Sequence, residues 1–297
     1  MRAMRTTSAI FAVLGLWIAP ATAQNQNNQI ERMDKMPIYR VNVVARTTKA
    51  INYRHRSGST RVDFQGTALM PRAKGDAKVD IHQGYLSVDA HFKNMEPAGK
   101  YGPEYLTYVL WAITPEGRPK NLGEVVLNCS IDSKLDVTTD LQAFGLIVTA
   151  EPYFSVTMPS DVVVMENVIR TDTVGKIEEI DAKYELLPRG QYTLNIRASQ
   201  LASANMKNQP SVSMEQYEAI TTLYQARNAI QIARADGAEQ AAGETLSKAS
   251  GYLSQAEAAY ARKNYKDMIN TARHAVEAAS DARMIAMRQK KDAAVQR

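Results

Sequence analysis

The sequence is poor in cysteine: one of its 297 residues is a cysteine. A lone cysteine excludes an intramolecular disulfide, a C-x-x-C redox pair and a cysteine-rich zinc site. Aromatic residues are also few, at 7%, whereas hydrophobic residues reach 45% and charged residues 23%. These proportions are ordinary for a folded protein, so they argue against long disorder, collagen and a coiled-coil rod.

Catalytic motifs are missing as well. The sequence has no G-x-S-x-G turn for a nucleophilic serine and no glycine-rich loop leading into a helix that could cradle a phosphate. His82 and His91 fall in neighbouring predicted strands but not at opposed positions, so we interpret them as surface histidines and not as metal ligands. We therefore expect a protein that is not an enzyme and that holds neither a metal ion nor a cofactor.

Long apolar runs are absent apart from I-F-A-V-L-G-L-W-I at 10–18, which is short for a membrane span. Arg2 and Arg5 precede this run, and an A-x-A cleavage site follows it at 21–23. The pattern predicts a secretory signal peptide over residues 1–23; the alternative is an anchor that is never removed. Cleavage removes two arginines, so the formal charge falls by two, from +5 to +3. We expect a soluble periplasmic protein of the cell envelope, without a transmembrane anchor.

The next residues divide the chain by composition. Residues 24–36 are polar and rich in Asn and Gln, which favours a flexible lead-in. Residues 37–196 carry short runs of Val, Ile, Tyr and Thr between turn signals, with clear alternation at 85–92. Many short strands without intervening helices are typical of an antiparallel sandwich. The prediction is an all-β sandwich over residues 37–196, with Trp111 as its core anchor.

The last part of the chain changes to a helical pattern. Residues 197–210 are the expected linker, and residues 211–297 are rich in Ala, Gln, Glu, Lys and Arg. Ser213 can cap the first helix, and Gly237 suits its end. A second helix is expected over 244–262 and a third from Asn264 to about 290. Short connections make neighbouring helices antiparallel, so a separate all-α three-helix up-down unit is predicted.

One stretch of the sequence contains basic residues and no acidic residues. Between Met36 and Arg61 there is no Asp or Glu, and six cationic residues occur in it: Arg40, Arg46, Lys49, Arg54, Arg56 and Arg61. Behind a secretory signal, this stretch fits an anionic envelope polymer or lipid headgroups better than nucleic acid, which we do not expect as a partner. The competing interpretation is an edge strand whose charges prevent pairing with other sheets.

The β region resembles a known exported domain. Y-V-L-W-A-I at 108–113, G-R-P at 117–119 and L-G at 122–123 are similar to a signature of RskA-type anti-sigma factors. The resemblance covers about residues 64–168 and implies an immunoglobulin-like sandwich. It implies the fold only, because the transmembrane helix and cytoplasmic zinc-binding segment of that family have no counterpart here.

The helical region carries a second resemblance. A-R-A-D-G at 233–237, N-Y-K-D at 264–267 and D-A-R at 281–283 resemble a helical domain of unknown function in exported bacterial proteins, often found ahead of OmpA-like domains. Its spacing also echoes one tetratricopeptide unit. The resemblance implies an envelope protein that acts through protein–protein interaction.

Three functional hypotheses follow. The first is a non-enzymatic structural or scaffolding protein of the envelope, which holds an envelope protein partner through residues 211–297. The second is a binding module for an anionic polymer or lipid surface through residues 36–61. The third is a hydrolase whose site is assembled from residues distant in sequence.

Overall fold

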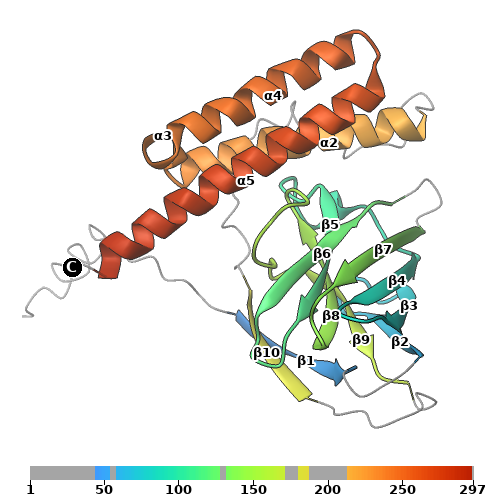
Figure 1. The fold of residues 1–297 in the computed structure, drawn as a ribbon. Helices are drawn as coiled ribbons and strands as arrows, with labels where there is room; N and C mark the ends of the chain where they lie inside the picture. Colours follow the sequence, from blue (N-terminus) through green and yellow to red (C-terminus); the bar gives the residue numbers. More distant parts are fainter. Residues whose placement is uncertain (1–43, 54–57, 128–131, 171–179, 187–212, 296–297) are drawn as a thin grey trace, which may run out of the picture. The chain divides into compact units, whose positions relative to one another are not determined.

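Strands fill the first part of the structure and helices the last (Figure 1). The computed structural model describes residues 44–53, 58–127, 132–170, 180–186 and 213–295. The predicted signal peptide, lead-in and linker lie outside these ranges. The strands are β1 (Val44–Asn52), β2 (Ser59–Gly66), β3 (Lys74–Ile81), β4 (Leu86–Lys93), β5 (Thr107–Ile113), β6 (Pro119–Val125), β7 (Ser133–Thr139), β8 (Ala143–Glu151), β9 (Val163–Val168) and β10 (Ile180–Leu186).

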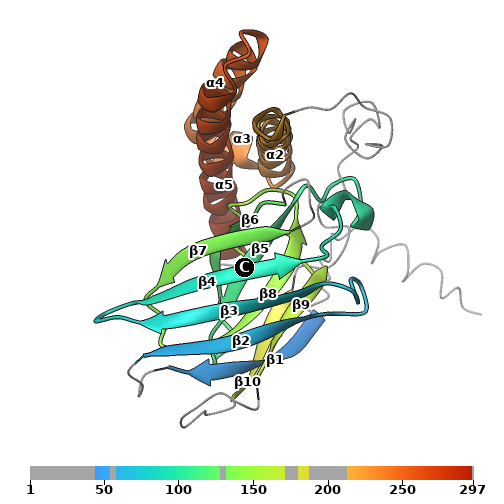
Figure 2. The ribbon, with the colours of Figure 1, turned by 90° about the vertical axis from the view of Figure 1, so that its right-hand side faces the viewer.

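Every strand pairing within the described ranges is antiparallel, as predicted. The order runs β10-β1-β8-β9-β2-β3-β4-β7, and β5 lies between β8 and β6. Strand β8 is the centre of this arrangement, because it pairs with β5, β1 and β9. In Figure 2, β7, β4, β3 and β2 lie side by side. The result is a sandwich of barrel-like form, whose two faces are joined through β8 and β9.

The sandwich interior follows from residue alternation. Strands β2, β3 and β4 bury alternate side chains, as expected when one face of a sheet is solvated. Their buried residues include Val62, Phe64, Val88 and Phe92, and they join one core cluster with Leu110 and others. The ring centres of Phe64 and Phe92 lie 5.1 Å apart.

Strands β5 and β8 differ, because both of their faces are buried. Tyr108 and Leu110 of β5 belong to the sandwich interior. Val109, Trp111 and Ile113 point the other way and belong to a second cluster, which also contains the buried residues of the helices. A continuous apolar run, rather than an alternating one, is the sequence pattern of such a strand.

The helical region has four helices in the described residues: α2 (Met214–Ala235), α3 (Ala238–Ala241), α4 (Gly243–Ala261) and α5 (Tyr265–Val295). Ser213 caps α2 as predicted, because its side chain accepts a hydrogen bond from the Gln216 amide at 3.1 Å. Asn264 caps α5 in the same way and accepts from the Asp267 amide at 3.3 Å. The one-turn helix α3 was not expected; it follows Gly237, which has a φ of 86°.

Alanine dominates the helical interior. Helix α5 packs against both α2 and α4 (Figure 1). Its buried residues include Ala272, Ala275, Ala279, Ala282 and Ala286. Small side chains let helix axes approach closely, so these helices share a thin, well-packed core. None of the helices described has the length and apolarity required to cross a membrane.

Contacts place the strands and the helices in one unit, Val41–Arg297. The division of the chain into separate domains therefore stays a prediction.

Candidate functional site

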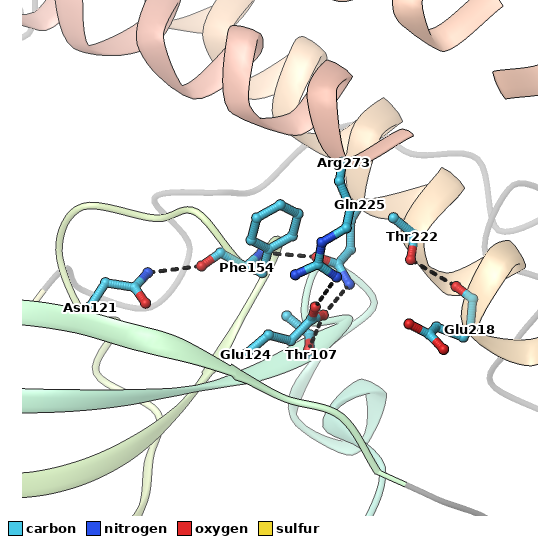
Figure 3. A network of polar contacts seen from close by, with 8 residues as sticks. All are labelled: Thr107, Asn121, Glu124, Phe154, Glu218, Thr222, Gln225 and Arg273. Atoms are coloured by element: carbon cyan, nitrogen blue, oxygen red, sulfur yellow. Dashed lines mark hydrogen bonds and ion pairs between the residues drawn. The ribbon is translucent and has the colours of Figure 1, made fainter. Parts of the chain in front are cut away.

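The helices meet the sandwich at a carboxylate on β6 (Figure 3). The Glu124 side chain is 5% exposed, and it accepts three hydrogen bonds. The donors are the Thr107 hydroxyl at 2.8 Å, the Gln225 amide of α2 at 2.6 Å and the Arg273 guanidinium of α5 at 2.9 Å. A buried carboxylate needs such partners, because an unpaired charge in the interior is costly.

The connection between β8 and β9 supplies the next contact. The Phe154 amide donates to Gln225 Oε1 at 2.9 Å, and the Arg273 guanidinium lies 4.1 Å from the centre of the Phe154 ring. On the sandwich side, the Asn121 side chain donates to the carbonyls of Phe154 and Val156 at 2.8 and 2.9 Å. The loop between β8 and β9 is therefore held by α2 and α5 on one side and by β6 on the other.

A second charged group is buried further along α5. The Arg283 side chain is 6% exposed, and its Nε donates to Asp236 Oδ2 at 2.6 Å. Its Nη1 donates to the Tyr153 hydroxyl at 3.2 Å. Burial raises the pKa of Tyr153, an effect that the charge of Arg283 opposes. One turn earlier, the Ser280 hydroxyl donates to the Ser155 carbonyl at 2.9 Å.

Glu151, at the end of β8, is a third buried ionisable group. Its Oε1 accepts from the Thr149 hydroxyl at 2.5 Å and from the Ser160 amide at 2.7 Å. Its Oε2 has no hydrogen-bond partner. Burial raises the pKa of Glu151 to about 8, although these hydrogen bonds and the charge of Arg283 act in the opposite direction. At neutral pH the group is therefore mainly a neutral acid.

Trp111 is connected to Glu151 through hydrogen bonds of the Thr149 hydroxyl. Its indole Nε1 donates to the Thr149 hydroxyl at 2.8 Å, and its side chain is fully buried. The structure places it in the cluster shared with the helices, not in the sandwich interior, where a core anchor was predicted. Successive side chains of a strand point to opposite faces, so Trp111 points to the same face of β5 as Val109 and to the face opposite Leu110.

The junction contains an open, shallow groove of about 460 Å³ beside Glu124, Phe154 and Arg273, and one small, more enclosed pocket. A pocket of about 40 Å³ lies between α2 and strands β5 and β6, with Glu124, Glu218 and Gln225 among its walls. That volume holds a few waters, whereas small-molecule sites have about 300–1,000 Å³. Glu151 has no exposed surface, so no substrate reaches its carboxyl. In the described ranges no three His, Cys, Asp or Glu side chains gather as metal ligands.

The predicted basic surface is only partly described. Lys49 on β1 and Arg61 on β2 are exposed, but β8 and β9 separate these strands in the sheet order. Arg46 lies opposite Tyr184 in the pairing of β1 with β10. Arg40, Arg54 and Arg56 lie outside the described residues. Arg61 faces Lys78 across β2 and β3, while the next pair on that face is Asp63 with Asp76.

One helical face is open and partly apolar. Met284, Ile285 and Met287 of α5 are 45%, 40% and 41% exposed. They line a shallow groove together with Thr157 and Arg288 among others. Large exposed apolar side chains that lie together on one helix mark a candidate contact surface.

Sequence reasoning missed Glu124, Arg273 and Arg283. A signal existed for Arg283, because it falls among the buried alanines of α5 in helical spacing, and a charge there requires a buried partner. No pattern identified Glu124, since its partners in the helices, Gln225 and Arg273, lie more than a hundred positions away in the sequence. Comparisons of this chain with protein families, curated proteins and solved structures find no match.

Proposed function

We propose that this chain is an exported, non-enzymatic structural protein of the cell envelope that holds a protein partner through its helical region. The signal-peptide pattern at residues 1–23 supports export. The resemblance of 233–283 to a helical envelope domain supports the interaction role. Within this proposal the sandwich is immunoglobulin-like, as in RskA-type anti-sigma factors, and α2, α4 and α5 form the three-helix up-down unit.

One observation carries the proposal: the buried charges described above are used to fix the helices to the sandwich. Glu124 accepts from both α2 and α5, and Arg283 donates to Tyr153 of the sandwich. Glu124 and Arg273 also border an open groove of about 460 Å³, but their charged groups bind each other across the junction. These contacts hold the helices on the sandwich as a helical platform.

Helix α4 is the part of that platform best placed for a partner. It packs mainly on α5 and leaves its outer face to solvent. Exposed positions in helical spacing on this face are Ser247, Gly251, Ser254 and Ala258. Short side chains make the surface flat, so another helix or strand could approach it closely.

The test is site-specific photo-cross-linking in intact cells. A photoreactive residue replaces Ser254 on α4 in one strain and Lys78 on β3 in a control strain. We expect one envelope protein to be cross-linked reproducibly from position 254 and not from position 78. Adding Gly251→Glu beside the probe should abolish that cross-link. Equal capture from both positions, or capture unaffected by Gly251→Glu, would contradict the proposal.

The alternative function is binding of an anionic polymer or lipid through residues 36–61. The exposure of Lys49 and Arg61 favours it, but Asp63 and Asp76 lie close to Arg61 in the sheet. In the same strains this alternative predicts no protein cross-link, together with sedimentation of the protein with envelopes that is lost as salt is raised. The variant Lys49→Glu/Arg61→Glu should weaken that sedimentation.

A further inference from the structure

Helix α5 carries a second stripe of side chains opposite its buried face. Exposed residues recur at intervals of four and three positions, which keeps them on one side of a helix. The stripe consists of Glu277, Asp281, Met284, Arg288, Lys291 and Val295. Here it is called the outer stripe. Its spacing is that of a helix that packs along another helix.

The charges of the outer stripe are sorted along the helix. The two acids, Glu277 and Asp281, come first, and the two bases, Arg288 and Lys291, come last. Met284 separates them, and Ile285 and Met287 flank it on either side with about two-fifths of their surface exposed. The stripe is therefore acidic, then apolar, then basic.

Such a sequence of charges is complementary to itself when one copy is reversed. If two outer stripes meet antiparallel, the acidic turn of each copy faces the basic turn of the other, and the methionines meet in the middle. If they meet parallel, like charges face each other and repel. A two-fold axis near Met284 and Met287 produces a closed contact in which both copies use the same surface.

The length of α5 supports an additional partner. Its 31 residues rise about 46 Å, whereas the 19 residues of α4 rise about 28 Å. The last residue of α5 with a buried side chain is Ala286, and every described residue after it is exposed. In Figure 1 this end of α5 continues past α3. An isolated helical end of this length is marginal in water, and packing on a second helix would stabilise it.

We propose that the chain forms an antiparallel homodimer through the outer stripe of α5. The contact uses α5, whereas the envelope partner proposed above uses α4, so the dimer does not depend on that proposal. Met284 and Met287 supply its apolar centre, where flexible methionines adapt well to a flat contact. The two acid–base clusters set the orientation.

The test measures the mass of the purified full chain by light scattering over a range of concentrations. The natural protein should have twice the mass of one chain and should dissociate on dilution and on addition of salt. An all-acidic stripe is made by Arg288→Glu/Lys291→Glu, and an all-basic stripe by Glu277→Lys/Asp281→Lys. Each variant alone should associate at least tenfold more weakly than the natural protein, because like charges then face each other.

Mixing the two variants gives the decisive result. An all-acidic stripe complements an all-basic stripe, so the mixture should form a dimer containing one chain of each kind. The control variant, Lys248→Glu/Arg262→Glu, makes the same change in charge as the all-acidic variant, at Lys248 on α4 and at Arg262 directly after its end, and should dimerise as the natural protein does. Circular dichroism verifies that each variant retains its helices.

Three outcomes would overturn the proposal. The natural protein could be a monomer at every concentration tested, the two charge variants could both remain dimers, or their mixture could fail to associate while both are folded. Because purified protein is used, none of these outcomes bears on the envelope partner of α4.

Discussion

Glu151 is a buried acid, and burial opposes the ionisation of its carboxyl group. Its carboxyl is fully buried, and two donors serve Oε1 while Oε2 has none. Burial raises its pKa to about 8, against an ordinary value of 4.5. Folding therefore favours the protonated form, and the folded protein binds a proton that the unfolded chain releases above about pH 5.

Because of this bound proton, the folded protein becomes less stable as the pH rises. The contribution of Glu151 is fully present below pH 4.5 and is lost as the pH rises through about 8. We expect the free energy of unfolding to fall over this interval by up to about 1.4 kcal/mol per pH unit from this residue. Glu151→Gln, which mimics the neutral acid, should remove that part of the slope. Urea unfolding at pH 5, 7 and 9 measures it.

The control for this prediction is Glu244→Gln on the exposed first turn of α4. It should leave the pH profile of the natural protein unchanged. If the Glu151→Gln and natural profiles run parallel from pH 5 to pH 9, Glu151 is ionised in the folded protein and its assignment as a neutral acid is wrong.

Arg283 is a buried charge with defined partners. Its removal leaves the Asp236 carboxylate and the Tyr153 hydroxyl without their donor. Breaking a buried ion pair costs about 3–5 kcal/mol, and we expect about 2–3 because the Asp236 side chain is 32% exposed. Arg283→Met keeps the volume of the stem and loses the charge. Lysine should not restore stability, since it lacks the planar fork of donors that reaches two partners.

Arg234→Met is the matched control, because Arg234 pairs with Glu239 on the surface, where both side chains are more than half exposed. Such a pair contributes less than about 1 kcal/mol. Thermal and urea unfolding of the two variants compare the sites. Equal losses would mean that Arg283 behaves as a surface residue.

At the scale of the element, strand β5 shows what the sequence could and could not predict. Its apolar run marked a strand, and the strand is present. The run could not say what covers each face, because a strand buried on both sides leaves no alternation to read. Trp111 was therefore assigned to the sandwich interior, and the structure places it on the opposite face.

The helices were easier to predict because their signals are local. Ser213, Gly237 and Asn264 mark ends through hydrogen bonds and backbone angles within a few residues. The junction depends on contacts across the chain. Arg273 meets Glu124 from 149 positions away, and no local pattern encodes such a meeting. That is why the starts of α2 and α5 could be placed from the sequence and the candidate site could not. The end of α5 was predicted at about residue 290, whereas the helix runs to Val295, and α3 was not predicted.

A glycine at the end of β2 is required by the turn that follows. A Cβ on Gly66 would lie 1.9 Å from the Met70 carbonyl oxygen and 3.0 Å from that of Ala73. The turn cannot open easily, because the Gly66 amide donates to the Ala73 carbonyl at 3.0 Å. We expect Gly66→Ala to lower the free energy of unfolding by roughly 2–4 kcal/mol through this clash.

Gly251 is the opposite case and gives the control. It lies inside α4, and a Cβ there meets nothing within 4 Å. Gly251→Ala should raise stability by about 0.5–1 kcal/mol, because alanine is the better helix former. Urea midpoints of both variants test the pair. Changes of the same sign at the two glycines would show that the close approach at Gly66 is absent.

For the whole molecule, the shared core determines how the protein unfolds. The cluster that contains Trp111 and Tyr153 also contains the buried alanines of α5. In addition, Glu124 of the sandwich accepts hydrogen bonds from Gln225 and Arg273 of the helices. Loss of the helices would expose Tyr153 to solvent and leave Glu124 with one hydrogen-bond donor, Thr107. Unfolding of either region should therefore destabilise the other.

The natural protein should therefore unfold in one cooperative transition. Hydrogen exchange measured against denaturant should give β8 and α5 the same free energy of opening. Gln225→Ala/Arg273→Ala removes two bonds to Glu124, each worth about 1.5–3 kcal/mol because the acceptor is charged. In that variant α5 should open at lower denaturant than β8. A control, Arg262→Ala at the exposed residue directly after α4, should leave the two segments coupled. If α5 already opens before β8 in the natural protein, the contacts at Glu124 do not couple the helices to the sandwich.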